Sequence, residues 1–158
     1  MAKVYVCGFL FSPDRSHVLL IRKRRPAWQA GKLNGIGGKV EPQETPAQAM
    51  AREFAEEAGV QVAHWREVVV LEGRPTSFDP DGWRGHFFAA VATAHDWENV
   101  RTLTDETIER HHVRHLPDEV IPNLRWMIPL MLDDDHAWAR AYTVRVLTPP
   151  DADGSQSG

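Results

Sequence analysis

The segment Pro46–Ala58 is the part of this chain that most restricts how it can fold. Thr45 is a favourable N-cap residue, Pro46 fits the first helical position, and Gln48 completes a capping box with Thr45. Gly59 stands where a left-handed C-terminal cap is expected. Apolar residues recur at helical spacing, namely Ala47, Met50, Ala51, Phe54 and Ala58. We therefore predict a helix over 46–58 whose apolar stripe packs against a sheet.

Strand-like segments lie on both sides of this helix. Residues 4–11 and 17–23 are apolar runs joined by turn residues, which predicts a hairpin. The glycine-rich stretch 26–38 is expected to be a loop that leads into a short strand around Lys39 and Val40. Further strands are expected at 65–72, 83–92, 108–116 and 138–147, and a second helix at 123–132 that Pro129 would kink or shorten. These elements predict an α/β or α+β fold with strands of mixed direction.

Length and composition indicate one soluble domain. The 158 residues suffice for a single core, which we place at 1–147, and the tail 148–158 has the composition of a disordered segment. The net charge of −4 argues against binding to polymeric nucleic acid, although residues 22–25 form a basic run that is either a solvated strand end or a phosphate contact. Cys7 is the only cysteine and lies in an apolar run, which suits a buried thiol in a reducing compartment. We expect a cytoplasmic protein without a membrane segment.

The polar side of the predicted helix carries three acids. Glu53, Glu56 and Glu57 stand at i, i+3 and i+4, so their carboxylates share one helical face. Arg52 can offset the charge of Glu56, but it cannot neutralise all three acids. The group is either a solvated acidic face or a site for a hard cation such as Mg²⁺ or Mn²⁺ completed by substrate phosphates. His111, His112 and His115 are assigned to a strand and its surface rather than to a transition-metal site.

A longer pattern decides between these two interpretations of the acids. It comprises Gly38, Glu44, Arg52-Glu53, Phe54, Glu56-Glu57, Gly59 and Val60, at the spacings of a Nudix box. Because nine constrained positions match in one window, the chain resembles the Nudix hydrolase family. The resemblance is strong over 34–60 and weaker over the rest of 4–147. It implies a mixed sheet sandwiched between helices, with the box forming a loop, a helix and a second loop.

The resemblance also implies different roles for the residues of the box. Glu53, Glu56 and Glu57 would bind the metal together with the carbonyl oxygen of Gly37. Four residues would be structural, namely Gly38, Glu44, Arg52 and Gly59, with Glu44 and Arg52 as an ion pair. A carboxylate would take the proton of the attacking water, either Glu53 or Glu56. Glu106 is the alternative base or ligand, and a loop-capping role for it is equally compatible with the sequence.

The flanks of the box bear on the substrate. Residues 33–40 resemble the segment of MutT-like oxidised purine nucleoside triphosphatases in which an asparagine hydrogen-bonds the purine, a position that Asn34 matches. Trp28 matches an aromatic position of the base pocket, where ordinary packing is the other interpretation. Arg24 matches a cation near the substrate, and Lys39 is assigned to substrate binding with them.

A second pocket segment departs from the pattern of its relatives. Residues 122–130 resemble the segment in animal enzymes of this subgroup that carries two adjacent acids and a preceding tryptophan. Here Asn123 and Leu124 replace the acids and Ile121 replaces the tryptophan. Asn123 could still hydrogen-bond a base, but readout by paired acids is lost.

We therefore expect hydrolysis of a nucleoside triphosphate, oxidised purines such as 8-oxo-dGTP included, to monophosphate and diphosphate. ADP-ribose, a dinucleotide or a capped RNA end are alternative substrates. A noncatalytic Nudix-fold ligand sensor is the alternative of another class, and the complete box argues against it.

Overall fold

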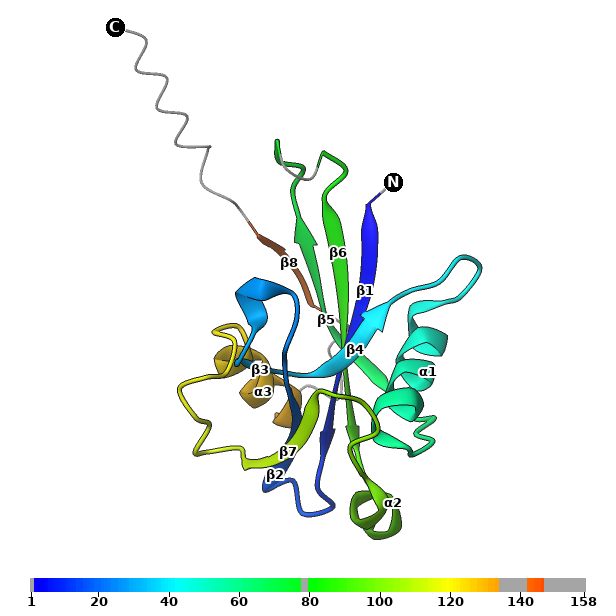
Figure 1. The fold of residues 1–158 in the computed structure, drawn as a ribbon, viewed down its shortest axis with the longest axis vertical. Coiled ribbons are helices and arrows are strands. Elements are labelled where there is room, and N and C mark those ends of the chain that lie inside the picture. The colour runs from blue at the N-terminus through cyan, green and yellow to red at the C-terminus, as the bar shows by residue number, and fades with distance from the viewer. Residues whose placement is uncertain (1, 78–79, 134–141, 147–158) are drawn as a thin grey trace, which may run out of the picture.

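A computed structural model describes residues 2–77, 80–133 and 142–146. Three α-helices and eight strands occur within these ranges, with one 3-10 turn (Figure 1). The strands are β1 Lys3–Phe11, β2 His17–Arg22, β3 Leu33–Asn34, β4 Ile36–Lys39, β5 Arg66–Gly73, β6 Trp83–Val91, β7 Thr107–His112 and β8 Tyr142–Val146. The helices are α1 Pro46–Ala58, α2 Ala94–Asn99 and α3 Leu124–Leu132, and the 3-10 turn η1 is Ala27–Gln29.

All eight strands belong to one mixed sheet. Its order is β3-β2-β1-β6-β5-β8, with β4 paired to β1 and β7 paired to β2. The predicted hairpin of β1 and β2 is antiparallel, whereas β1 and β6 run parallel over nine residue pairs. The expectation of an α+β fold with strands of mixed direction is confirmed.

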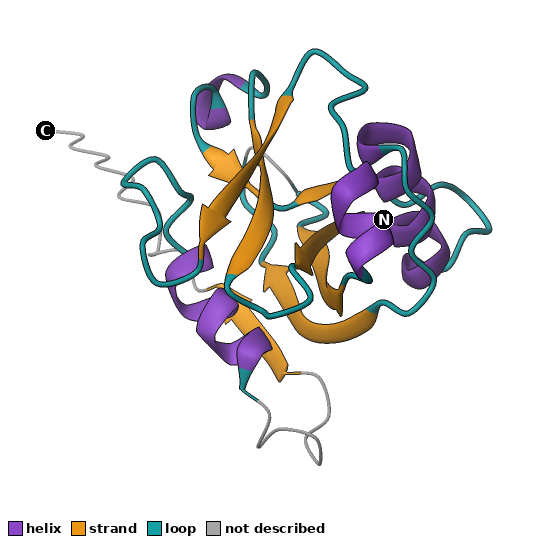
Figure 2. Cartoon of the chain, turned by 90° about the horizontal axis from the view of Figure 1, so that it is seen from below, coloured by secondary structure: helices purple, strands orange, loops and turns teal. Residues whose placement is uncertain are grey.

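Helices cover both faces of the sheet (Figure 2). α1 buries Met50, Phe54 and Ala58 in a cluster that also holds Leu10 and Ile36. α3 packs on the other face, where Leu124, Met127 and Ile128 join a second cluster around Phe9 and Phe11. Successive side chains of β1 point to opposite faces of the sheet, so Phe9 and Phe11 enter one cluster and Leu10 enters the other.

The caps of α1 confirm the strongest expectation from the sequence. The Thr45 side chain accepts a hydrogen bond from the backbone N–H of Gln48, and the Gln48 side chain accepts one from the N–H of Thr45. Gly59 has φ 74°, the left-handed conformation expected at this end. The predicted stripe needs one correction, because Ala47 is exposed in the first turn and Ala49 is buried instead.

Other differences lie in the loops. The expected loop over 26–38 contains β3, and the short strand expected around Lys39 and Val40 starts earlier, at Ile36, because the glycines of β4 let its backbone pair with β1 from Tyr5 to Gly8. α2 was not expected, although Thr93 caps it by accepting from the N–H of Asp96. α3 continues past Pro129 to Leu132. β7 ends at His112 rather than near residue 116. Of the strand expected at 138–147, only β8 over Tyr142–Val146 is described, and the tail 148–158 lies outside the described residues.

Candidate active site

Two glycines of β4 bring the sheet against the acidic helix. A Cβ atom added at Gly37 would overlap the backbone of Val6 on β1, so this position requires glycine for strand pairing. A Cβ atom added at Gly38 would lie 2.5 Å from the carboxylate of Glu53. The absence of both side chains therefore lets the β4 backbone and the Glu53 carboxylate approach each other closely.

Arg52 organises the polar face of α1. Its guanidinium donates to both carboxylate oxygens of Glu44, at 2.7 and 2.9 Å, so the predicted ion pair is present. It also donates to the carbonyl of Lys39 at 3.1 Å and to Glu53 at 2.8 Å, with a longer contact of 3.4 Å to Glu56. These bonds lower the pKa of Glu44 to about 2, chiefly through the Arg52 hydrogen bond. Arg52 thus joins the loop before α1, the end of β4 and the acidic face.

Glu57 occupies a different environment from the other acids of α1. Its Oε2 atom is buried and has no hydrogen-bond partner in the structure. Burial raises the pKa of this carboxyl to about 7, Lys23 opposes the rise, and the charges of Glu53 and Glu106 add to it. A partly buried carboxylate with one buried, unpartnered oxygen among other acids is an electrostatic arrangement that a bound cation would relieve.

The backbone around Glu57 is also fixed. The carbonyl oxygen of Glu57 accepts the N–H of Leu103 at 3.2 Å, and that of Ala58 accepts the N–H of Arg101 at 3.2 Å. The segment 101–106 therefore runs directly from the end of α1 to Glu106. The charge of Glu106 contributes to the raised pKa of Glu57.

Glu106 is buried and fully engaged with the end of β2. Its carboxylate accepts hydrogen bonds from Lys23 Nζ at 2.7 Å and from the backbone N–H groups of Arg24 and Arg25 at 2.5 and 3.4 Å. Although burial by itself raises its pKa, the hydrogen bonds from Lys23 and Arg24 lower it below the ordinary value. A carboxylate held by three donors is a weak base, and this favours the loop-capping role over the catalytic one.

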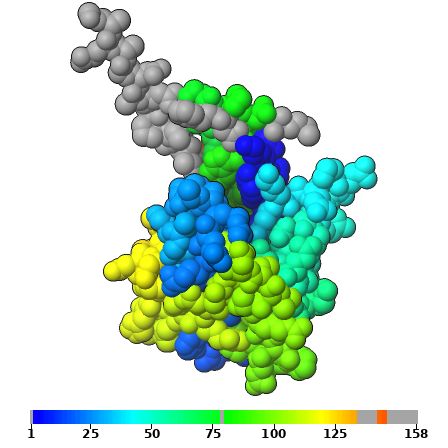
Figure 3. All heavy atoms as spheres, viewed as in Figure 1, coloured from blue at the N-terminus to red at the C-terminus, as the bar shows by residue number. Residues whose placement is uncertain are grey.

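The basic run at the end of β2 pairs with acids at the start of β7. Arg22 contacts Glu109, Lys23 contacts Glu106, and Arg25 contacts Asp105 at 2.5 Å, with Arg24 3.8 Å from the same aspartate. Figure 3 shows the surface of the blue segment around η1 directly above that of the yellow-green segment around β7. Lys23 belongs to the basic run that the sequence left open between a solvated strand end and a phosphate contact, and its side chain is 17% exposed beside Glu106.

The acids do not form a ready-made metal cage. Within residues 2–77, 80–133 and 142–146, no three His, Cys, Asp or Glu side chains gather as a group that could hold a metal. The carboxylates of Glu53 and Glu106 accept hydrogen bonds from Arg52 and Lys23 respectively. The Glu56 side chain is 58% exposed. Binding of a cation at Glu57 would therefore require the neighbouring carboxylates to turn toward it.

The residues assigned to base recognition lie on η1, β3 and the start of α3. The Asn34 side chain donates to Gln29 at 3.2 Å and accepts from the N–H of Gly35 at 2.8 Å and from the Cys7 thiol at 3.6 Å. Burial raises the pKa of this thiol to about 12, as expected for a cysteine without a nucleophilic role. β3 is tied to the segment before α3, because the carbonyl of Leu33 accepts the N–H of Ile121 at 3.0 Å.

Trp28 and Asn123 differ in exposure. The Trp28 residue is 65% exposed on η1, which argues against ordinary core packing. Asn123 precedes α3 and makes no side-chain capping bond, and its Oδ1 atom is buried without a partner. Lys39 is exposed at the end of β4. The structure thus provides one exposed ring and one unsatisfied amide oxygen in the two segments assigned to the base.

These features define a class before any relative is considered. A mixed sheet lies between helices, and a glycine-rich strand is joined through an acidic loop to a helix that carries three glutamates. The model of the NUDIX domain family matches residues 1–146. The chain belongs to this family.

Individual relatives agree with this assignment. The chain is 34% identical over 72 residues to the 8-oxo-dGTP diphosphatase of Escherichia coli (strain K12). The match spans 46% of this chain and 56% of that protein, so it covers little more than half of the curated relative. In the described part of the chain, no helix is long and apolar enough to cross a membrane.

Solved structures show the same fold. The MutT NUDIX hydrolase of Burkholderia pseudomallei has a TM-score of 0.68 at 20% identity, covering 84% of this chain and 99% of that one. The MutT protein of Bacillus halodurans has a TM-score of 0.66 at 17% identity, covering 90% and 89%. At these identities the likeness establishes the fold alone.

Proposed function

We propose that this chain is a divalent-metal-dependent hydrolase that cleaves a nucleoside triphosphate to a monophosphate and diphosphate. The observation that carries the proposal is the buried, unpartnered Oε2 of Glu57 on a helix face that also presents Glu53 and Glu56. Oxygen donors of this kind suit Mg²⁺, with Mn²⁺ as the alternative. Glu53, Glu56 and Glu57 would hold the metal with the carbonyl oxygen of Gly37.

A metal bound there would neutralise phosphate charge and lower the pKa of a water molecule. Oxygen from that water would form a bond to phosphorus while a diphosphate P–O bond breaks, and the proton of the water would pass to a carboxylate. Glu53 and Glu56 remain the two candidates for this base. Glu106 is better suited to keep the end of β2 and Lys23 in place, since three donors already hold its carboxylate.

The base of the substrate would lie between η1, β3 and the start of α3. Trp28 offers an exposed ring for stacking, and Asn123 offers an Oδ1 acceptor without a partner. Asn34 would contribute the second hydrogen of its amide NH2, since the first is donated to Gln29 and its Oδ1 already accepts from Gly35 and Cys7. Arg24 and Lys39 would contact the phosphates. The name of the E. coli relative, an 8-oxo-dGTP diphosphatase, supports including oxidised purines among the substrates.

A substrate panel tests this proposal. The purified chain is incubated with Mg²⁺ and canonical or oxidised nucleoside triphosphates, ADP-ribose, dinucleotides or capped RNA, and the products are identified. We expect monophosphate and diphosphate from a triphosphate. Turnover of ADP-ribose, a dinucleotide or capped RNA without any triphosphate would refute the substrate class. Binding without turnover on the whole panel would indicate a noncatalytic sensor.

A further inference from the structure

Gln29 is the least exposed residue of the 3-10 turn η1. Ala27 and Trp28 are exposed, whereas Gln29 is half-buried. The Oε1 atom of Gln29 accepts a hydrogen bond of 3.2 Å from Nδ2 of Asn34 on β3. This contact ties the turn that carries the exposed Trp28 ring to the strand that carries Asn34, so Gln29 lies between two residues assigned to the base.

The direction of this hydrogen bond is fixed by the backbone. The N–H of Gly35 donates to Oδ1 of Asn34 at 2.8 Å. Because a backbone N–H can only donate, the Asn34 atom that it meets is the oxygen, and the NH2 group of Asn34 is the one that faces Gln29. The Gln29 atom that meets this NH2 group is in turn its oxygen. The Nε2 group of Gln29 is therefore left for another partner.

This Nε2 group is a donor that the chain itself does not use. It has no hydrogen-bond partner among the residues that the structure describes, and it is not buried. An accessible amide nitrogen held in one orientation offers two hydrogens to a ligand beside η1. Asn34 adds the second hydrogen of its own NH2 group. The two amides together therefore present hydrogen-bond donors from neighbouring elements.

An acceptor lies on the same face of the sheet. The thiol of Cys7 donates to Oδ1 of Asn34 at 3.6 Å and packs against the core cluster under α3, so the Asn34 amide lies on the α3 face. Asn123 precedes α3, and its Oδ1 atom is buried without a partner. Donors from η1 and β3 and an acceptor from the start of α3 thus share one face.

Purines of two kinds differ in polarity at adjacent positions. A 6-oxo purine carries an acceptor at O6 and a donor at N1–H, whereas adenine carries a donor at its 6-amino group and an acceptor at N1. We propose that Gln29 is a specificity-determining residue that donates from Nε2 to O6 of a 6-oxo purine, while Oδ1 of Asn123 accepts from N1–H. Adenine would place its amino group against the donors of Gln29. The inference rests on the function proposed above, because it requires the base to lie between η1, β3 and α3.

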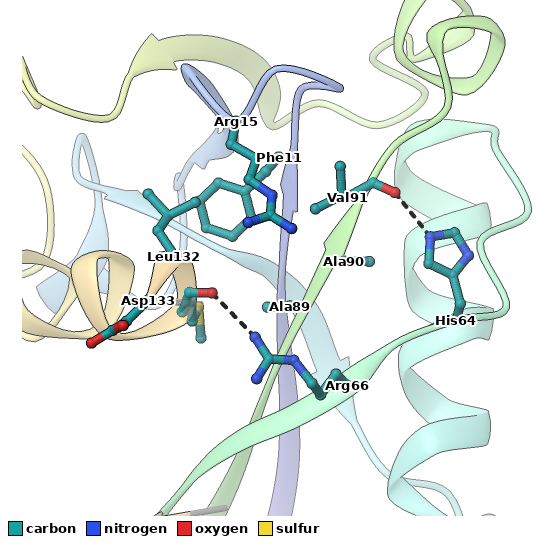
Figure 4. Close-up of a pocket in the computed structure, with 10 residues that line it drawn as sticks. Phe11, Arg15, His64, Arg66, Ala89, Ala90, Val91, Leu132 and Asp133 are labelled. Carbon is teal, nitrogen blue, oxygen red and sulfur yellow. Dashed lines mark hydrogen bonds between the residues drawn. The ribbon is translucent and has the colours of Figure 1, made fainter. Parts of the chain in front are cut away.

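A titration tests this role without turnover. The chain is titrated in Mg²⁺ with inosine and adenosine 5′-monophosphate, which differ at positions 6 and 1 and have no diphosphate bond to cleave. The inosine nucleotide should bind at least about threefold to tenfold more tightly, the effect of about one hydrogen bond. Its addition should shift the NMR signal of the Gln29 side-chain NH2, which is assigned from its absence in Gln29→Met. The methyl signals of Ala89 and Val91, which line a separate cavity of about 400 Å³ (Figure 4), should not move.

Variants of Gln29 separate recognition from stability. Gln29→Met removes the donor at similar size, and Gln29→Glu replaces it with an acceptor. Gln29→Met should reduce the preference for the inosine nucleotide about threefold to tenfold, and Gln29→Glu should reduce it further. A purely structural role would weaken the binding of both nucleotides alike and leave their ratio unchanged. Gln61→Met, at an exposed glutamine between α1 and β5, should bind as the parent chain does.

Kinetics provide a second readout. With inosine 5′-triphosphate, Gln29→Met should raise KM and leave kcat nearly unchanged, because Gln29 contacts the base and not the reacting phosphate. Equal binding of the two nucleotides by the parent chain, an unchanged ratio in both Gln29 variants, or shifts confined to Ala89 and Val91 would overturn the role of Gln29 alone. A parent chain that shows the preference in binding but hydrolyses no triphosphate would refute the proposed function and leave this inference standing.

Discussion

Arg52 and Glu44 are joined by two hydrogen bonds, of 2.7 and 2.9 Å, that tie the loop before α1 to the polar face of the helix. The pairing is bidentate, the geometry in which an arginine and a carboxylate interact most strongly. The same guanidinium contacts Glu53 and the carbonyl of Lys39. Any change at this pair therefore reaches both the acidic face and the end of β4.

The first prediction concerns acid stability. Hydrogen bonding lowers the pKa of Glu44 from 4.5 to about 2, so its contribution is present above pH 4.5 and is lost as the pH falls to about 2. Glu44→Gln should lower the melting temperature at neutral pH. Between pH 4.5 and about 2, the melting temperature of this variant should fall less than that of the parent chain. Thermal melts across this range measure the effect, with Glu41→Gln as the control because its carboxylate is 3.9 Å from Arg52 and 65% exposed. An equal loss in both variants would contradict the assignment.

The second prediction concerns Glu57 in the metal-free protein. Burial raises its pKa from 4.5 to about 7, so the folded state is favoured by protonation. Its contribution is fully present below pH 4.5 and is lost as the pH rises through about 7. The shift corresponds to at most about 3 kcal/mol, and solvent screening of the partly exposed carboxyl reduces this. Melting in EDTA should show the loss in the parent chain and not in Glu57→Gln.

Addition of Mg²⁺ should reverse this loss. Above pH 7 the metal should raise the melting temperature of the parent chain and leave that of Glu57→Gln nearly unchanged, because the metal stabilises only the folded state that binds it. Glu57→Gln should also nearly abolish hydrolysis, while Glu98→Gln on the exposed part of α2 should retain it. Full activity in Glu57→Gln would show that the metal is held elsewhere.

The third prediction separates the two glycines of β4. A methyl group at Gly37 meets the backbone of Val6, which cannot move without breaking the strand pair, so Gly37→Ala should cost about 1–3 kcal/mol or more. A methyl group at Gly38 meets the end of the flexible Glu53 side chain. Gly38→Ala should therefore remain folded and lose activity. Urea unfolding and hydrolysis assays on both variants test the contrast, which fails if Gly38→Ala retains full activity.

The fourth prediction concerns the effect of Asn123 and Asn34 on the stability of the fold and on purine binding. The Oδ1 of Asn123 is buried without a partner, so Asn123→Leu should stabilise the fold by about 1–3 kcal/mol while weakening the binding of the purine. Asn34 hydrogen-bonds Gln29, Gly35 and Cys7, so Asn34→Ala should lower both the stability of the fold and the affinity for the purine. Unfolding midpoints and KM for a purine triphosphate measure these changes. A destabilised Asn123→Leu variant would show that the Nδ2 contact with Met127 Sδ, at 3.9 Å, contributes more to stability than the unpartnered Oδ1 costs.

Several elements were predictable because their signals are local. Pro46–Ala58 and its two caps follow from side chains within a few residues of each other. β4 was not predictable in its true position, because a glycine-rich strand has no pattern of its own and forms only on the edge of β1. α2 has six residues and one capping signal at Thr93, too little to stand out from a loop.

The sequence by itself determined that Glu53, Glu56 and Glu57 share one helical face, because helix geometry fixes the relative positions of residues three and four apart. Only the tertiary structure decided how they differ. Burial against the sheet and the charge of Glu106 raise the pKa of Glu57, and Lys23, which is 83 positions from Glu106, reaches the same space through the pairing of β2 with β7. Desolvation and charge depend on neighbours that are distant along the chain, and helical spacing carries no information about them.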